Sequence, residues 1–260
     1  MKIVINADDM GYTRSISQGI REGYRCGLVS SSTVMSHMPF AASVPELLKD
    51  TPIPLGCHLT LTCGKPLTGG KSLVNEEGNF WKYRDFYSRT IDVGEAYAEF
   101  KAQIEKFIEI FERRPTHLDS HQGCTDGVSV LLKNNPELAS KHNTKEIYEM
   151  SLALAKEYDL PLRRNCEFEW TDVFYGENAT VETIIRHIEN NRDKDIEFMV
   201  HPAYCDLELY RRSSYNTYRV KELDALCDQR LIDYFLENDI DLVDYTGRKK
   251  DLRQLSKPEM

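Results

Sequence analysis

The sequence lacks the features of a membrane protein and of a secreted, disulfide-linked domain. Its 260 residues contain no apolar run near the roughly 20 residues that a membrane span requires. The N-terminal stretch MKIVINADDM carries an apolar run too short for the core of a signal peptide. The seven cysteines are scattered and form no CxxC pair, which indicates reduced thiols. We therefore predict a cytoplasmic protein that does not bind a membrane.

Positive charge is also in short supply. The chain has 33 lysines and arginines against 42 aspartates and glutamates, which gives a net charge of −9. Such a field repels phosphate backbones, so we do not expect a nucleic-acid partner. The net negative charge is still compatible with a small anionic substrate that a few local arginines hold. Hydrophobic residues make up 41% of the chain, enough to bury a substantial core. No linker or repeat divides it, so we expect one catalytic domain over residues 1–260.

The hydrophobic pattern alternates between short apolar runs and helical stripes. Strands are predicted at residues 2–6, 29–35, 55–61, 116–120, 162–168, 196–201 and 240–244. Helices are predicted at residues 13–26, from 43, at 95–112, from 136, at 180–191 and at 218–237. This alternation predicts an α/β fold with a parallel sheet covered by helices. At this length a closed or nearly closed β/α barrel of about seven strands fits better than an open sheet, although periodicity alone does not distinguish them. A long insert at residues 64–94 interrupts the rhythm.

Polar residues that can bind metal fall at the ends of four predicted strands. They are Asp8, Asp9, His58, His117, Asp119, His121 and His201. Residues after the carboxyl ends of parallel strands gather on one face, where active sites are built. Two imidazoles and one carboxylate leave open positions on a metal for water, and a spare aspartate is available as a base. Each piece also has a structural interpretation: the aspartate pair as a loop cap, and the HxDxH of residues 117–121 as a hydrogen-bond network.

Four separated motifs resemble those of a known enzyme family. They are NADDMG at residues 6–11, GxHLTL at 56–61, PTHLDSH at 115–121 and HPAY at 201–204, followed by RxxEL at 219–223. In this combination and order they resemble the YdjC/ChbG family of carbohydrate deacetylases, and the resemblance extends from residue 2 to about residue 244. It implies a distorted β/α barrel related to that of the polysaccharide deacetylases.

The resemblance also implies roles for individual residues. Asp9, His58 and His121 would bind one divalent metal ion. Asp8 would be the general base, and His201 would be the general acid that protonates the departing amine. Magnesium is the ion that the resemblance implies, while two histidines and an aspartate also suit zinc or another transition ion.

Further positions would support the metal ligands. His117 and Asp119 would orient the ligating imidazoles, since such rings usually donate their second N–H to a carboxylate or carbonyl. After His121 many family members continue with another histidine pair, whereas this chain has Gln122, Gly123 and Cys124. That departure leaves the ligand set intact and changes the part of the loop that faces the substrate.

The predicted substrate is a small N-acetylglucosamine oligosaccharide, diacetylchitobiose or its 6-phosphate, from which the enzyme releases acetate. Candidate substrate contacts are Trp81 in the insert and three arginines, Arg163, Arg164 and Arg211. Trp81 could instead pack the insert onto the body of the protein or onto a dimer partner, and Arg211 could belong to a solvated surface. We expect a homodimer. A phospho-glycoside hydrolase and a non-catalytic sugar-binding protein are the alternative functions.

Overall fold

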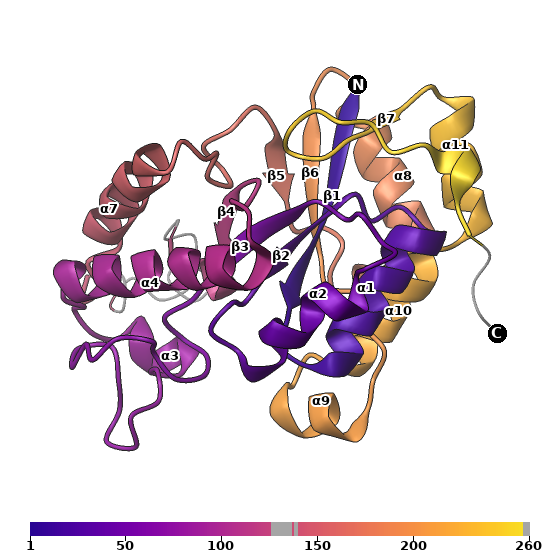
Figure 1. Cartoon of the computed structure of the whole chain (residues 1–260). Helices are drawn as coiled ribbons and strands as arrows, with labels where there is room; N and C mark the ends of the chain where they lie inside the picture. The colour runs from indigo at the N-terminus through magenta and orange to yellow at the C-terminus, as the bar shows by residue number, and fades with distance from the viewer. Residues whose placement is uncertain (126–136, 138–139, 257–260) are drawn as a thin grey trace.

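Seven parallel strands form the centre of the molecule (Figure 1). The computed structural model describes residues 1–125, 137 and 140–256. Its strands are β1 (Lys2–Met10), β2 (Ser31–Val34), β3 (Leu55–Leu59), β4 (Leu118–Ser120), β5 (Glu169–Thr171), β6 (Ile196–Val200) and β7 (Asp241–Leu242). The order across the sheet is β4-β3-β2-β1-β6-β5, and β7 pairs with β1. The predicted α/β fold with about seven parallel strands is confirmed.

An irregular segment next to β4 makes the barrel a distorted one. Leu162 forms a parallel bridge with Leu118. The backbone N–H of Leu118 donates to the carbonyl of Pro161 at 2.9 Å, and Arg163 donates back to Leu118 at 2.9 Å. The chain then continues to β5 at the other edge. The predicted strand at 162–168 is therefore wrong in its bounds, because that range holds only isolated bridges at Leu162 and Asn165 and the strand itself lies at Glu169–Thr171.

Helices cover the sheet and follow the predicted alternation. They are α1 (Arg14–Cys26), α2 (Val44–Leu47), α3 (Tyr83–Phe86), α4 (Val93–Phe111), α7 (Thr144–Glu157), α8 (Val181–Glu189), α9 (Leu207–Arg212), α10 (Thr217–Leu226) and α11 (Gln229–Glu237). Helix α4 packs against β3 and α7, and α1 packs against β1 and α10. The predicted helix from residue 136 begins outside the described residues.

One predicted helix is two helices in the structure. The pattern of residues 218–237 predicts a single helix, but α10 ends at Leu226 and α11 begins at Gln229. Asp228 separates them, because its carboxylate accepts a hydrogen bond from the backbone N–H of Arg230 at 2.8 Å. A side-chain cap of this kind starts a new helix.

The strands β1 to β4 are buried on both faces, as expected for a parallel sheet between helices. Residues 3–10 of β1 are all buried, and the apolar core extends from this strand to the helices around it. In Figure 1, β1 runs from the N-terminus at the top toward the bottom of the view, where α9 and α3 lie. The carboxyl ends of the strands therefore meet at the end of the molecule that carries α9 and the 64–94 segment.

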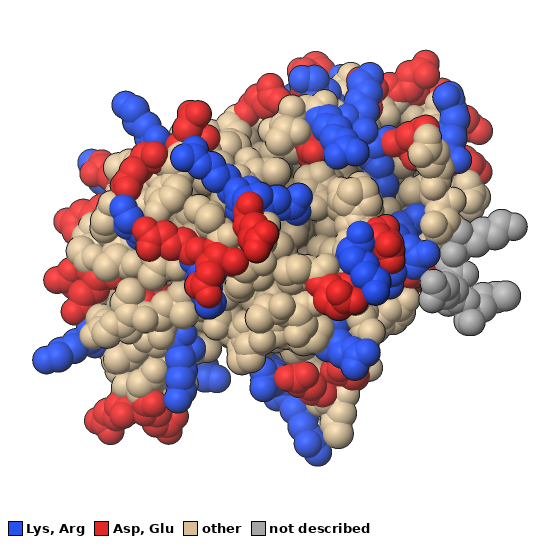
Figure 2. Space-filling view, in the orientation of Figure 1, with Lys and Arg blue, Asp and Glu red and all other residues tan. Residues whose placement is uncertain are grey.

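The 64–94 segment has a small structure of its own, with α3 and an antiparallel bridge between Val74 and Phe80. The Tyr87 hydroxyl donates to the carbonyl of Gln122 at 2.8 Å, which ties this segment to the loop after β4. Over the face seen in Figure 2, basic and acidic side chains are intermixed. Within the described residues, no helix has the length and apolar character to cross a membrane.

Candidate metal centre

The first strand, β1, carries two aspartates, Asp8 and Asp9, near its carboxyl end, where the chain turns sharply. Asp9 has φ +73°, a left-handed conformation that is uncommon for a residue other than glycine. Its carbonyl accepts a hydrogen bond from the backbone N–H of Tyr12 at 3.1 Å. Asp8 and Asp9 are both almost completely buried. Strained backbone of this kind, held by the surrounding structure, is typical of functional positions.

Three side chains from separate strands converge beside this turn. The Asp9 Oδ1 atom lies 3.2 Å from His58 Nε2 and 2.9 Å from His121 Nδ1. Asp9 lies near the carboxyl end of β1, His58 lies on β3, and His121 comes directly after β4. Asp9 and His58 are buried, whereas the His121 side chain is 21% exposed and opens the group to solvent. The structure thus brings together the three residues that the resemblance implies as ligands.

The donor set suits a divalent metal ion. Around an ion with ligands at about 2.0–2.1 Å, tetrahedral geometry places the ligand atoms about 3.4 Å apart, close to the distances found here. The second ring nitrogen of His58, Nδ1, lies 2.7 Å from Asp119 Oδ1. This is the contact with which a carboxylate fixes the tautomer of a ligating histidine. Asp119 is itself held by the Thr33 hydroxyl, which donates to it at 2.9 Å.

Opposite charges perturb the ionisation of this group. Burial opposes ionisation of Asp9, but the positive charge of Arg219 and hydrogen bonds from both histidines hold its pKa well below the usual range. Burial also opposes protonation of His58, yet the carboxylates of Asp119 and Asp8 raise its pKa to about 10. A metal ion that binds here must displace the proton on His58, so metal binding releases protons.

Asp8 is held by an arginine from the irregular segment after β4. Arg163 Nη1 and Nη2 donate to the two oxygens of Asp8 at 2.8 and 2.7 Å. The amide of Asn6 donates to the same carboxylate at 2.9 Å. Burial alone would raise the pKa of Asp8, but the charge and hydrogen bonds of Arg163 hold it well below the usual range. Asp8 is therefore ionised and fixed in orientation.

Arg163 also takes the place that a second cation would occupy. Asp8, His58 and Asp119 form another buried group with metal-binding atoms. Arg163 Nη2 lies 3.0 Å from Asp119, and Arg163 Nε lies 2.6 Å from Glu197 on β6. Only 4% of the Arg163 side chain is exposed. Its guanidinium balances three carboxylates, so the position predicted for a substrate contact instead lies inside the barrel against Asp8.

His201 follows β6 at the edge of the site. Its side chain is 14% exposed, and its Nδ1 lies 4.0 Å from Glu222. Burial and the nearby positive charge of Arg219 lower the pKa of His201 to about 4. The rings of Tyr175 and Tyr215 stand edge-on to it, with centroids 5.9 and 5.7 Å away. The imidazole is therefore neutral at neutral pH.

Helix α10 supplies two site residues to which the sequence analysis assigned no role. Arg219 Nη2 donates to Asp9 Oδ2 at 2.6 Å. Glu222 accepts hydrogen bonds from the backbone N–H of His201 and from the Tyr215 hydroxyl. Burial raises the pKa of Glu222 to about 8. The signal was the RxxE spacing of residues 219–222, which places both side chains on one face of a helix.

The predicted supporting residue His117 lies farther from the ligands than Asp119 does. Its ring stacks on Tyr245, with centroids 3.6 Å apart, and its Nδ1 lies 3.0 Å from the Thr116 hydroxyl. Gly56 on β3 makes room for it, because a Cβ there would lie 2.5 Å from the ring. Among the described residues, Thr116 is the hydrogen-bond partner that the structure shows for the His117 ring. It packs inside the barrel.

The other predicted substrate contacts are spread over the molecule. The indole N–H of Trp81 donates to the carbonyl of Ser72 at 2.9 Å, and the Arg89 guanidinium lies 3.3 Å from the ring centroid. Trp81 thus packs within the 64–94 segment. Arg164 lies over the ring of Trp170 at 3.6 Å. Arg211 is exposed on α9, at the end of the molecule that holds the carboxyl ends of the strands.

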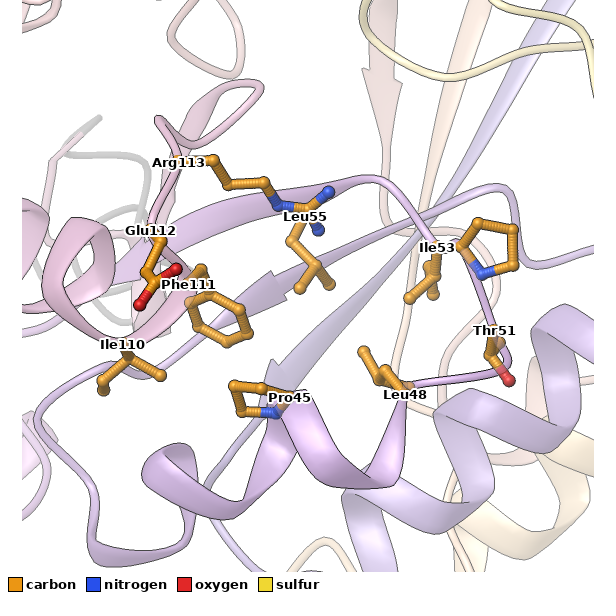
Figure 3. A pocket seen from close by; sticks show the side chains of 10 residues that line it. Pro45, Leu48, Thr51, Ile53, Leu55, Ile110, Phe111, Glu112 and Arg113 are labelled. Carbon is orange, nitrogen blue, oxygen red and sulfur yellow. The ribbon is translucent and has the colours of Figure 1, made fainter.

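A groove at the opposite end of the sheet contains none of the candidate residues. Figure 3 shows Pro45 and Leu48 of the α2 region facing Phe111 at the end of α4. Leu55 also lines it and is the first residue of β3, whereas His58 lies near the carboxyl end of the same strand. The groove is thus separate from the metal-binding group.

The fold and the site define a class: a β/α-barrel protein whose strand ends carry a group of two histidines and one aspartate that could hold one metal ion. The chain belongs to the YdjC-like protein family, whose model matches residues 2–237. The predicted membership of this family of carbohydrate deacetylases, which are hydrolases, is confirmed.

Curated relatives and a solved structure cover nearly the whole chain. A protein from Listeria innocua named carbohydrate deacetylase 2 is 35% identical over 94% of this chain and 98% of its own length. A carbohydrate deacetylase from Vibrio cholerae is 34% identical over 95% of this chain and 96% of its own. The crystal structure of a candidate cellobiose-phosphate cleavage protein from Enterococcus faecalis superimposes with a TM-score of 0.83. It is 30% identical and covers 96% of this chain and 99% of that one.

Proposed function

We propose that this protein is a metal-dependent hydrolase that removes the N-acetyl group from a small N-acetylglucosamine oligosaccharide and releases acetate. Diacetylchitobiose or its 6-phosphate is the proposed substrate. The observation that carries the proposal is the convergence of Asp9, His58 and His121. An ionised aspartate, Asp8, and a neutral histidine, His201, stand beside them, and the named relatives are deacetylases.

The metal ion would be held by Asp9 Oδ1, His58 Nε2 and His121 Nδ1. When bound, it would polarise the acetyl carbonyl and lower the pKa of a water molecule. We propose magnesium first, on the family resemblance, and zinc as the alternative that the nitrogen ligands favour.

The chain's own residues would move the protons. Asp8, ionised and fixed by Arg163, would accept the proton of the attacking water. His201 would carry a proton to the departing amine. Because its pKa is lowered, the protonated imidazole is a strong acid and gives up its proton readily. Since the resting ring is neutral, the proton that Asp8 takes from the attacking water would have to reach His201 before it is passed to the amine, so that amide and water give acetate and a free amine.

Aromatic and basic side chains near His201 would bind the sugar. Tyr175 is 45% exposed, and its ring stacks on Tyr215 with centroids 4.2 Å apart. Aromatic faces suit the apolar faces of sugar rings. Arg211 and Arg212 on the neighbouring helix α9 are exposed and would meet a 6-phosphate. Trp81 and Arg164 are less suited to bind the sugar, because Trp81 already stacks with Arg89 and Arg164 already stacks on Trp170.

An acetate-release assay tests this function. The full-length protein would be stripped with a chelator, reloaded with Mg²⁺ or Zn²⁺ separately, and given chitooligosaccharides with and without a 6-phosphate. We expect acetate and a free amino sugar of unchanged chain length. A shorter sugar without acetate would indicate a glycoside hydrolase instead, and binding without turnover would indicate a non-catalytic sugar-binding protein.

We further propose that residues 1–260 act as one catalytic domain in the cytoplasm, as a homodimer. Light scattering of the purified protein tests the assembly, and a monomer of about 30 kDa at micromolar concentration would contradict it.

A further inference from the structure

Helix α10 touches both halves of the candidate site. Arg219 and Glu222 lie one turn apart on the helix, and both side chains are buried. Arg219 contacts Asp9 near the carboxyl end of β1, and Glu222 contacts the backbone of His201 directly after β6. These two strand ends carry Asp9 and His201, which have different roles in the proposed reaction.

Arg219 fixes the carboxylate of Asp9. Its Nη2 donates to Asp9 Oδ2 at 2.6 Å, and its Nε donates to the carbonyl of Tyr215 at 2.8 Å, so the guanidinium is held at two points. The second carboxylate oxygen, Oδ1, then faces His58 and His121 at 3.2 and 2.9 Å. The backbone of Asp9 is left-handed, and a conformation of this kind persists where contacts from the surrounding structure hold it.

Glu222 fixes the backbone that carries His201. It accepts from the N–H of His201, and the carbonyl of Arg219 accepts from the N–H of Ala203 at 3.1 Å. Within the described part of the chain, His201 Nδ1 has no hydrogen-bond partner. The ring is therefore placed by its backbone and by the rings of Tyr175 and Tyr215 beside it.

We propose that Arg219 and Glu222 are positioning residues: Arg219 orients Asp9 toward the metal ion, and Glu222 holds His201 at its distance from that ion. Where turnover is measured, this proposal rests on the proposed function. Arg219 and Glu222 would act through their contacts with Asp9 and His201, and neither side chain needs to touch the substrate.

The Arg219 half is tested with metal alone. The chelator-stripped full-length protein is titrated with Co²⁺, and its visible absorption reports binding and ligand geometry. Arg219→Gln and Arg219→Lys should each weaken Co²⁺ binding by about 10–100-fold, as expected for loss of a contact behind a ligand. Lys keeps the charge and loses the two-point contact. Parental affinity and spectrum in Arg219→Lys would overturn positioning, because charge alone would then suffice.

The Glu222 half is tested with two complementary substitutions. Glu222→Gln keeps the length and can accept from His201 while donating to the Tyr215 hydroxyl. Glu222→Asp keeps the carboxyl group and withdraws its oxygens by one methylene. If Glu222 positions His201, kcat should stay within about threefold of the parent in Glu222→Gln and fall by about 10-fold or more in Glu222→Asp. Metal affinity should be parental in both. The reverse order of kcat values would overturn it.

A matched control and a substrate-free measurement complete the test. Lys221→Gln changes an exposed residue of the same helix, which pairs with Glu177, and should alter neither affinity nor kcat. The imidazole NMR signals of His201 should shift in Glu222→Asp and stay in place in Glu222→Gln. Unchanged signals in both would overturn the proposal.

A parent enzyme that releases no acetate would contradict the proposed function, while the Co²⁺ and NMR results would still decide the two positioning roles.

Discussion

At the scale of single residues, the two neighbouring aspartates have separate surroundings. Asp8 faces a bidentate arginine, whereas Asp9 faces two histidines and a second arginine. Adjacent side chains that meet different partners are expected to have different functions.

Asparagine at these positions should separate the two roles. Asp8→Asn should keep its metal and lose about 10²-fold or more in turnover, because an amide does not accept a proton at neutral pH. It should also melt lower, since Arg163 loses an ion pair. Asp9→Asn should lose metal affinity, and excess metal should partly restore its rate. Metal titration and single-turnover acetate release measure both. If Asp8→Asn is the variant rescued by metal, the assignment is reversed.

A buried histidine outside the metal-binding group should make stability depend on pH. Burial lowers the pKa of His37 to about 4, and one ring nitrogen lies 2.9 Å from the carbonyl of Cys63. The unfolded pKa is about 6.5, so the unfolded chain binds the proton first. The stabilisation is fully present above about pH 6.5 and is lost as the pH falls toward 4.

His37→Gln should flatten this dependence by on the order of 2 kcal/mol between pH 7 and pH 4. The measurement is the free energy of unfolding in urea at both pH values for parent and variant. Equal losses in the two proteins would show that His37 does not contribute.

At the scale of elements, a close approach between α1 and the segment after β6 positions His201. A Cβ on Gly19 of α1 would lie 2.4 Å from the Cα of Ala203. The N–H of Tyr204 also donates to the carbonyl of Ser15 at 3.3 Å. Helix and segment therefore meet backbone to backbone.

Gly19→Ala should displace that segment. We expect a loss of about 1–3 kcal/mol in unfolding free energy, despite the better helix propensity of alanine, because the new methyl overlaps backbone atoms. Turnover should fall while metal affinity stays parental, since the metal ligands lie on other elements. Gly69→Ala, where a Cβ meets no atom within 4 Å, is the control. Equal stability of the two variants would refute the close packing.

At the scale of the whole molecule, the proposed ion would join β1, β3 and the loop after β4. A ligand that binds only the folded state stabilises it, by about 2.7 kcal/mol at 100 times its Kd. For a chain of this size that corresponds to about 5–10 °C in melting temperature. Chelation should therefore lower the Tm of the parent by about this amount.

His58→Ala serves as the control for this measurement. Because it removes a proposed ligand, its melting temperature should not respond to the chelator. A chelator effect of the same size in His58→Ala would mean that the stabilising ion binds elsewhere.

The sequence by itself determined the fold class and which strand ends meet. Hydrophobic periodicity is a local property, and parallel strands place their carboxyl ends at one edge, so the gathering of the polar residues that follow these strands was predictable. The family resemblance then singled out Asp9, His58 and His121 among them. The break at Asp228 was missed because both halves of residues 218–237 carry a helical pattern and only the cap separates them.

Only the tertiary structure decided which charges pair. Arg163 and Asp8 are 155 positions apart, and Arg219 and Asp9 are 210 apart. No sequence pattern links them, because an ion pair depends on how two backbones approach and where each side chain can reach. For the same reason the sequence placed Arg163 with the substrate, whereas the fold buries it beneath Asp8. The strand ends bring together aspartates and histidines, but the ion pairs that hold the two aspartates come from α10 and from the segment after β4.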